Sequence, residues 1–239
     1  MLTPRSTLTR RVVAALDASP SRIPVLLGGC GSGRSTLLQQ LRERIGRTAA
    51  HFIDVERTAT TPERFLRAVA GTSPFPVADA SGQEAGARAA FDATLAFFDR
   101  ARTGGGSPAT FLLDEFLEFR TFESFPGLRR VFHELADMLT TSGNRFVLTS
   151  RYTARVLRLL RDRSARFEVI HMPALTAEDT LDMLGPSIGP LSSGDGQDAE
   201  YVARTVQALA DGRPAYVRAI ADELLAMHDQ GGSDALSAL

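Results

Sequence analysis

The sequence predicts an α/β protein in which helices cover both faces of a parallel five-stranded sheet and a small helical domain follows. Two observations predict this fold. Five short apolar segments alternate with helical segments between residues 23 and 171, without the apolar-polar alternation of strands that have one wet face. After residue 172 only helical patterns remain. We therefore expect an α/β domain at residues 1–172 and a helical lid domain at residues 173–239.

Each element follows from local patterns. The expected strands are at residues 23–27, 49–55, 109–115, 145–151 and 167–171. Apolar residues at helical spacing predict helices at residues 5–18, 34–46, from 61 onward, 84–102, 127–141, 153–162, 177–184, 199–210 and 213–228. Irregular stretches rich in Gly, Pro and Ser are expected at residues 72–83 and 185–196, and a loose tail from residue 231.

Composition excludes several classes of protein. A chain of 239 residues with 44% hydrophobic residues can bury one sizeable core. The net charge of -1 gives no support to non-specific nucleic-acid binding by the whole surface. A single cysteine excludes an internal disulfide framework. We expect a cytoplasmic protein without a membrane anchor, because no apolar run approaches 18 residues and no signal peptide is recognisable.

A glycine-rich loop separates the first expected strand from the helix at residue 34. Glycine permits backbone conformations that turn successive N–H groups inward around a polyphosphate, and the helix N-terminus adds further donors. The spacing is that of the Walker A loop, which binds nucleotide phosphates. The predicted nucleotide-binding residues of this loop are Gly28, Gly29, Cys30, Gly31, Ser32, Gly33, Arg34, Ser35 and Thr36.

Arg34 departs from the Walker A pattern, which has lysine at this position. The chain contains no lysine at all, so part of this difference reflects a general bias toward arginine. Arginine keeps its charge and can still bind phosphate oxygens. Its longer planar group must lie differently from an ammonium, and a misplacement of about 1 Å can cost roughly 100-fold in rate. We therefore expect ATP binding with slow turnover.

Two acidic residues end the strand at 109–115. Asp114 is positioned to hold Mg²⁺ through a water molecule, together with the hydroxyl of Ser35, which follows Arg34. Glu115 is the candidate general base that activates the attacking water. The alternatives are structural: a hydroxyl at a helix N-terminus for Ser35 and an acidic turn at a strand end for the carboxylates.

Arginines follow the strand at residues 145–151. Arg151 at its tip is a candidate sensor of the terminal phosphate, and the alternative is a surface arginine paired with a nearby acid. The arginines beyond it form either a solvated face or a binding patch for nucleic acid or an acidic partner. These arginines are Arg155, Arg158, Arg161, Arg163 and Arg166.

Four motifs together resemble the STAND class of P-loop signal-transduction ATPases and their AAA+ relatives. They are the loop at 28–36, the strand Phe111-Leu-Leu-Asp-Glu115, the segment Val147-Leu-Thr-Ser-Arg151 and Gly212-Arg-Pro214. The segment from Met172 to Leu184 also resembles the start of the helical domain of these proteins. The resemblance implies a P-loop NTPase fold, γ-phosphate sensing by Arg151 and a nucleotide contact by Pro214.

The expected function is therefore an ATP-dependent switch with ATP and Mg²⁺ as ligands. Nucleotide state would control assembly of the chain with itself or with a separate effector protein, and slow hydrolysis would reset it. One alternative is an AAA+ motor that works as an oligomeric ring. Another is a DNA-associated loader or transposition-type regulator that binds nucleic acid through Arg155, Arg158 and Arg161.

Overall fold

The computed structural model describes residues 4–76, 86–188 and 196–229. The chain divides into two compact units. We call residues 9–28 and 34–171 the sheet unit. The helical unit contains the helices after residue 171 together with the short segments 4–8 and 29–33. The predicted domain boundary after residue 172 stays a prediction.

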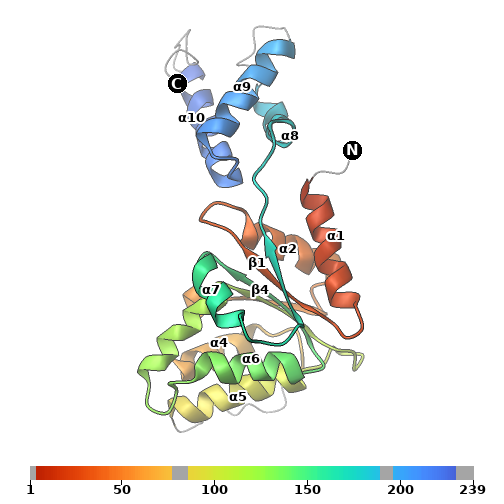
Figure 1. Ribbon diagram of the computed structural model, residues 1–239, viewed down its shortest axis with the longest axis vertical. Helices are drawn as coiled ribbons and strands as arrows, with labels where there is room; N and C mark the ends of the chain where they lie inside the picture. Colours follow the sequence, from red (N-terminus) through yellow and green to blue (C-terminus); the bar gives the residue numbers. More distant parts are fainter. Residues whose placement is uncertain (1–3, 77–85, 189–195, 230–239) are drawn as a thin grey trace. The chain divides into compact units, whose positions relative to one another are not determined.

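The sheet unit contains a parallel five-stranded sheet with the spatial order β2-β3-β4-β1-β5. Its strands are β1 (Ile23–Leu27), β2 (Ala50–Asp54), β3 (Thr110–Asp114), β4 (Arg145–Ser150) and β5 (Phe167–His171). All five were predicted from apolar runs, and the α/β prediction with a parallel sheet is confirmed. β1 and β4 lie side by side in Figure 1, with Leu27 of β1 opposite Ser150 of β4.

Ten α-helices and one 3-10 helix are present in the described part of the chain. Those up to residue 171 are α1 (Pro4–Asp17), α2 (Arg34–Ile45), α3 (Val55–Thr58), α4 (Pro62–Thr72), α5 (Ala87–Arg100), the 3-10 helix η1 (Phe116–Ser124), α6 (Val131–Thr141) and α7 (Thr153–Leu160). The helical unit has α8 (Ala177–Ile188), α9 (Gly196–Leu209) and α10 (Pro214–Asp229). None of these helices is long and apolar enough to cross a membrane.

Strands β1, β3 and β4 are buried on both faces, which explains their continuous apolar sequences, whereas the edge strand β5 is mostly only partly buried. Phe111 and Leu113 of β3 belong to one core, which also contains side chains from α4, α5 and α6. Leu112, between them, points to the opposite face, because successive side chains of a strand alternate. Helix α2 contacts β2, β3 and β4 and buries Leu37, Leu38 and Leu41. In the sequence, α2 begins at Arg34, directly after the loop that follows β1.

A second core holds the helical unit together. Helix α8 packs against α9 and α10, with Val202 and Val206 of α9 and Val217 of α10 buried between them. Gly212 begins the turn into α10 with a φ of +59°. A Cβ atom there would lie 2.8 Å from the carbonyl oxygen of Leu175, so only glycine fits this turn.

Several element boundaries differ from the predictions. The predicted irregular stretch at 185–196 is wrong at both ends, because α8 continues through Gly185 to Ile188 and α9 already begins at Gly196. Packing of α8 against α9 and α10 overrides the low helix propensity of Gly185 and Pro186. Helix α6 starts at Val131 rather than 127. Most of the predicted loop at 72–83 and the tail from 231 lie outside the described residues.

The fold also contains elements that the apolar patterns did not predict. After β2 the chain forms the one-turn helix α3, whose N-cap Asp54 accepts a hydrogen bond from the backbone N–H of Arg57 at 3.0 Å. After β3 it forms η1. Both elements begin where a strand ends, and they place acidic side chains at the carboxyl edge of the sheet.

His51 provides a stability prediction. Its ring is buried beside Phe75 and Phe111, and its Nε2 atom lies 3.2 Å from Oγ1 of Thr72. Burial, together with the charge of Arg42, lowers the pKa of His51 to about 4. In the unfolded chain the pKa is about 6.5, so between these values the unfolded state binds more protons. The contribution of neutral His51 to the free energy of unfolding is complete above the pKa that the residue has in the unfolded chain. It is lost as the pH falls toward 4.

We expect His51→Phe to remove this dependence on pH. Relative to the variant, wild type should lose about 2 kcal/mol of unfolding free energy between pH 7 and pH 5. Urea denaturation of both proteins at pH 7, 6 and 5 measures the difference. Parallel stability curves for the two proteins would contradict the buried neutral histidine.

Candidate active site

The ends of four neighbouring strands carry the polar residues of the candidate site. In spatial order, Glu56 follows β2, Glu115 follows β3, Arg151 follows β4 and Gly28 follows β1. The carboxyl ends of parallel strands share one edge of a sheet, which is where ligands bind in such folds. The strand order therefore brings side chains together that are far apart in the sequence.

Arg34 and Glu115 form a buried ion pair. They are 7% and 6% exposed, and Nη2 of Arg34 donates to Oε1 of Glu115. The other terminal nitrogen of Arg34 donates to the carbonyl oxygen of Gly28. The guanidinium group thus bridges the start of the loop and the candidate base, using two nitrogen atoms at a fixed separation.

The second oxygen of Glu115 is also engaged. The backbone N–H of Arg151 donates to Oε2 of Glu115 at 3.1 Å. Glu115 itself has a φ of +54°, a left-handed conformation that is uncommon outside glycine. Its backbone N–H donates to Oγ1 of Thr149 at 3.0 Å, which holds this turn in place. The carboxylate is therefore oriented by Arg34 on α2 and by the backbone of the residue that follows β4.

Asp114 is buried at the end of β3 and accepts a hydrogen bond from the hydroxyl of Thr149. The same hydroxyl accepts from the backbone of Glu115, so Thr149 links both acidic residues to β4. Ser35 and Thr36, in the first turn of α2, are exposed. A hydroxyl at the start of the helix after the loop and a carboxylate at a strand end are the donor set of a Mg²⁺ site in phosphate-binding loops.

Arg151 is held by two carboxylates. Its Nη1 and Nη2 atoms donate to Oε2 and Oε1 of Glu56 at 3.0 and 2.7 Å, and Nη2 also contacts Oε1 of Glu118 at 3.3 Å. Its guanidinium carbon lies 5.0 Å from the centre of the Tyr152 ring. The hydrogen bonds from Arg151 lower the pKa of Glu56, and those to Glu56 raise the pKa of Arg151, so both stay charged near neutral pH.

Within the helical unit, the loop segment 29–33 contacts the start of α10. The backbone N–H of Ala215 donates to the carbonyl oxygen of Gly31 at 3.2 Å. Gly31 has a φ of +76°, and a Cβ atom there would lie 3.3 Å from that of Ala215. Gly29 lies beside the guanidinium of Arg213, since an added Cβ would be 3.5 Å from its Nη1. Cys30 is exposed, and Pro214 is the first residue of α10.

The residues present fit a polyphosphate with a divalent cation. Gly31 and Gly33 have φ values of +76° and +83°, backbone conformations of the kind that anion-binding loops use. Helix α2 is 12 residues long and begins directly after this loop. The donor chemistry of Ser35 and Asp114 matches Mg²⁺, which prefers oxygen ligands and retains water molecules.

The arginine run after β4 divides into two groups. Arg155, Arg158 and Arg161 are exposed along α7 and its end. Arg163 pairs with Asp137 at 2.9 Å, and Arg166 donates to the carbonyl oxygens of Ser21 and Thr140. Arg163 and Arg166 therefore stabilise the sheet unit, and the prediction of a surface run that includes them is wrong. Local sequence could not separate the groups because their partners lie on other elements.

Sequence reasoning missed three residues of this site: Glu56, Glu118 and Thr149. Glu56 and Glu118 each follow a predicted strand by a few residues, and an acidic residue at that place in a parallel sheet was an available signal. Thr149 lies within the strand predicted at residues 145–151, two positions before the predicted site residue Arg151. Its role depends on the pairing of β3 with β4.

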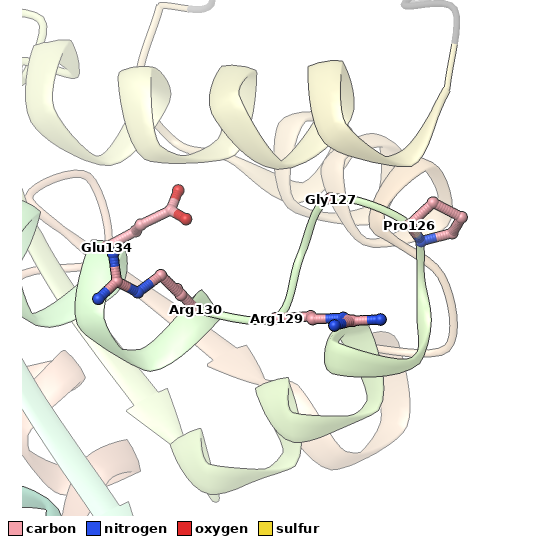
Figure 2. A pocket seen from close by; sticks show the side chains of 5 residues that line it. All are labelled: Pro126, Gly127, Arg129, Arg130 and Glu134. Atoms are coloured by element: carbon pink, nitrogen blue, oxygen red, sulfur yellow. The ribbon is translucent and has the colours of Figure 1, made fainter.

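A separate cavity of about 450 Å³ lies at the start of α6. It is lined by Pro126, Gly127, Arg129, Arg130 and Glu134, none of which is a predicted site residue. Arg129 and Arg130 point in opposite directions from the loop, so their guanidinium groups do not converge on one ligand (Figure 2). This cavity is not part of the candidate active site.

No family profile matches the chain, and no curated protein matches it significantly. Solved structures do match. A Walker-type ATPase of Pyrococcus abyssi has a TM-score of 0.70 and 16% identity, with 99% of this chain and 71% of that chain covered. The Aeropyrum pernix ORC1 protein in complex with DNA has a TM-score of 0.54 and 18% identity over 89% of this chain and 62% of that chain.

RuvB of Thermotoga maritima is a further structural neighbour, with a TM-score of 0.57 and 11% identity over 98% of this chain and 65% of that chain. The chain thus spans about two thirds of the length of these three proteins. At such low identities the similarity establishes the fold. It confirms the predicted P-loop NTPase fold followed by a helical region.

Proposed function

We propose that this protein is an ATP-binding switch of the P-loop class, in which nucleotide state controls assembly of the chain with itself or with a separate effector protein. The observation that carries the proposal is the pairing of both candidate phosphate-binding arginines with carboxylates: Arg34 with Glu115, and Arg151 with Glu56. Phosphate oxygens and carboxylates compete for guanidinium groups. ATP binding therefore exchanges ion pairs at the sheet edge.

Each residue has a chemical role in the proposed reaction. The loop backbone and Arg34 hold the phosphates, and Arg151 contacts the γ-phosphate. Ser35 and Asp114 would hold Mg²⁺, which neutralises charge on the phosphate oxygens when it is bound. Glu115 accepts a proton from the attacking water while the oxygen of that water bonds to the γ-phosphorus. The bond from the γ-phosphorus to the bridging oxygen breaks, and ADP leaves with that electron pair.

The ion pair of Glu115 supports slow hydrolysis. A general base must direct a lone pair at the attacking water, and Arg34 and the backbone of Arg151 hold the two oxygens of Glu115. In the fraction of ATP-bound molecules that keeps the pair with Arg34, the carboxylate is directed at Arg34 rather than at the water, which slows the chemical step. A slow chemical step leaves the ATP-bound form long-lived, which suits a switch better than a motor.

Two arrangements of the same charges support a switch. In one, the arginines bind carboxylates of the sheet unit; in the other, they bind phosphates. A ligand shifts such an equilibrium by its difference in affinity for the two arrangements. ATP reaches Arg151 through its γ-phosphate and ADP does not, so the two nucleotides stabilise different arrangements.

Calorimetric titration with Mg²⁺-ATP and Mg²⁺-ADP, a phosphate-release assay and light scattering on the same sample test this function. We expect saturable binding of both nucleotides, turnover below about 1 s⁻¹ and a larger particle mass with ATP than with ADP. Absence of binding of either nucleotide would contradict the proposal. Turnover well above that limit, with a closed ring as the assembled form, would support a motor instead.

A DNA-associated regulator is the second candidate. One structural neighbour is an ORC1 protein in complex with DNA, and Arg155, Arg158 and Arg161 form an exposed basic row here. If these three arginines contact DNA phosphates, a plot of the logarithm of DNA affinity against the logarithm of salt concentration should have a slope of about -2.7. Replacing all three by Gln should abolish this dependence. DNA affinity that does not respond to salt would exclude the candidate.

A further inference from the structure

Glu56 holds the guanidinium group of Arg151 through both terminal nitrogens. The two contacts, at 3.0 and 2.7 Å, join residues 95 positions apart in the sequence. The side chain of Arg151 is 26% exposed and that of Glu56 is 47% exposed. Because both side chains reach solvent, separating the two charges costs little free energy. Arg151 can therefore exchange the carboxylate of Glu56 for another anion.

The position of Glu56 is determined by the local structure around it. Asp54 ends β2 and caps α3 by accepting a hydrogen bond from the N–H of Arg57 at 3.0 Å. The hydroxyl of Thr58 donates to the carbonyl oxygen of Asp54 at 2.5 Å. These contacts fix the one-turn helix that carries Glu56 directly after the strand. Its carboxylate is thereby presented to the residue that follows β4.

Arg151 is also anchored at its backbone. Its N–H donates to Oε2 of Glu115, so the main chain stays beside the candidate base while the side chain reaches across to Glu56. Glu118 contacts the same side chain at 3.3 Å and also pairs with Arg120 at 3.2 Å. Rotation of the side chain therefore moves the guanidinium group between carboxylates and any phosphate at the strand ends without moving the backbone.

We propose that Glu56 is a specificity-determining residue that competes with the γ-phosphate of ATP for Arg151 and thereby reduces the preference of the site for ATP over ADP. This inference rests on the proposed function. Because the contacts with Glu56 use both terminal nitrogens of Arg151, a γ-phosphate that takes the same pair of N–H donors must displace the carboxylate. ADP lacks that phosphate, and its affinity does not depend on the exchange.

The test is titration of wild type and Glu56→Gln with Mg²⁺-ATP and Mg²⁺-ADP. Glutamine keeps the size of the side chain and removes the charge that competes with phosphate. We expect the Kd for ATP to fall about fivefold, in line with the small value of exposed pairs, and the Kd for ADP to change less than twofold. Glu43→Gln is the matched control, since Glu43 pairs with Arg47 on the exposed face of α2 at 2.8 Å. It should change neither constant.

A double-mutant cycle assigns the effect to Arg151. In the Arg151→Gln background, Glu56→Gln should no longer alter the Kd for ATP, because the guanidinium group for which Glu56 and the phosphate compete is absent. Thermal denaturation without nucleotide verifies that each variant is folded. If wild type binds ATP and Glu56→Gln binds it no more tightly, the proposed role of Glu56 is overturned and the proposed function is not. Failure of wild type to bind ATP overturns the proposed function as well.

Discussion

Glu115→Gln is expected to lower ATP turnover by about 100-fold or more, because general-base catalysis contributes about 10² to 10⁴ in rate. Glutamine has nearly the same shape, and its amide oxygen still accepts a hydrogen bond. It removes the negative charge that pairs with Arg34. Arg34 is then held less firmly at the sheet edge and binds phosphate more readily. Affinity for ATP should therefore be retained or increased while hydrolysis is lost.

Single-turnover phosphate release and calorimetry measure these two effects separately. Glu123→Gln is a suitable control, because Glu123 is exposed near the end of the same 3-10 helix. It should leave both turnover and binding unchanged. Hydrolysis by Glu115→Gln at the wild-type rate would show that another group activates the water.

Arg34→Lys is expected to raise the rate of hydrolysis, by up to about 100-fold if the present misplacement is near 1 Å. A single ammonium nitrogen does not present the two nitrogen atoms, at a fixed separation, through which Arg34 links Glu115 to the carbonyl oxygen of Gly28. Lysine therefore releases Glu115 more easily and places a compact charge between the phosphates. The gain should appear in the chemical step rather than in affinity for ADP.

Steady-state and single-turnover rates of Arg34→Lys, beside wild type, test this expectation. Arg44→Lys on the exposed side of the same helix controls for lysine introduction and should have no effect. In the Glu115→Gln background the gain should disappear, because the faster step requires that carboxylate. A lysine variant that hydrolyses ATP no faster than wild type would show that arginine is no handicap at this position.

Much of the candidate site was predictable because its residues occupy special places along the chain. The glycine-rich loop is recognisable by its spacing, and Asp114, Glu115 and Arg151 each end an apolar run. The partners of these residues were not predictable in the same way. Glu56 and Glu118 were overlooked because nothing in their local sequence connects them with Arg151, although both lie near strand ends.

The sequence by itself determined the fold class, the five strands and the loop, because burial on both sheet faces requires continuous apolar runs and tight backbone turns require glycine. Only the tertiary structure decided the strand order, and with it which strand ends are neighbours. It joined Arg34 to Glu115 and Arg151 to Glu56, and separated Arg163 from the exposed arginines. The physical reason is that an ion pair depends on distance in space, which packing of remote segments sets.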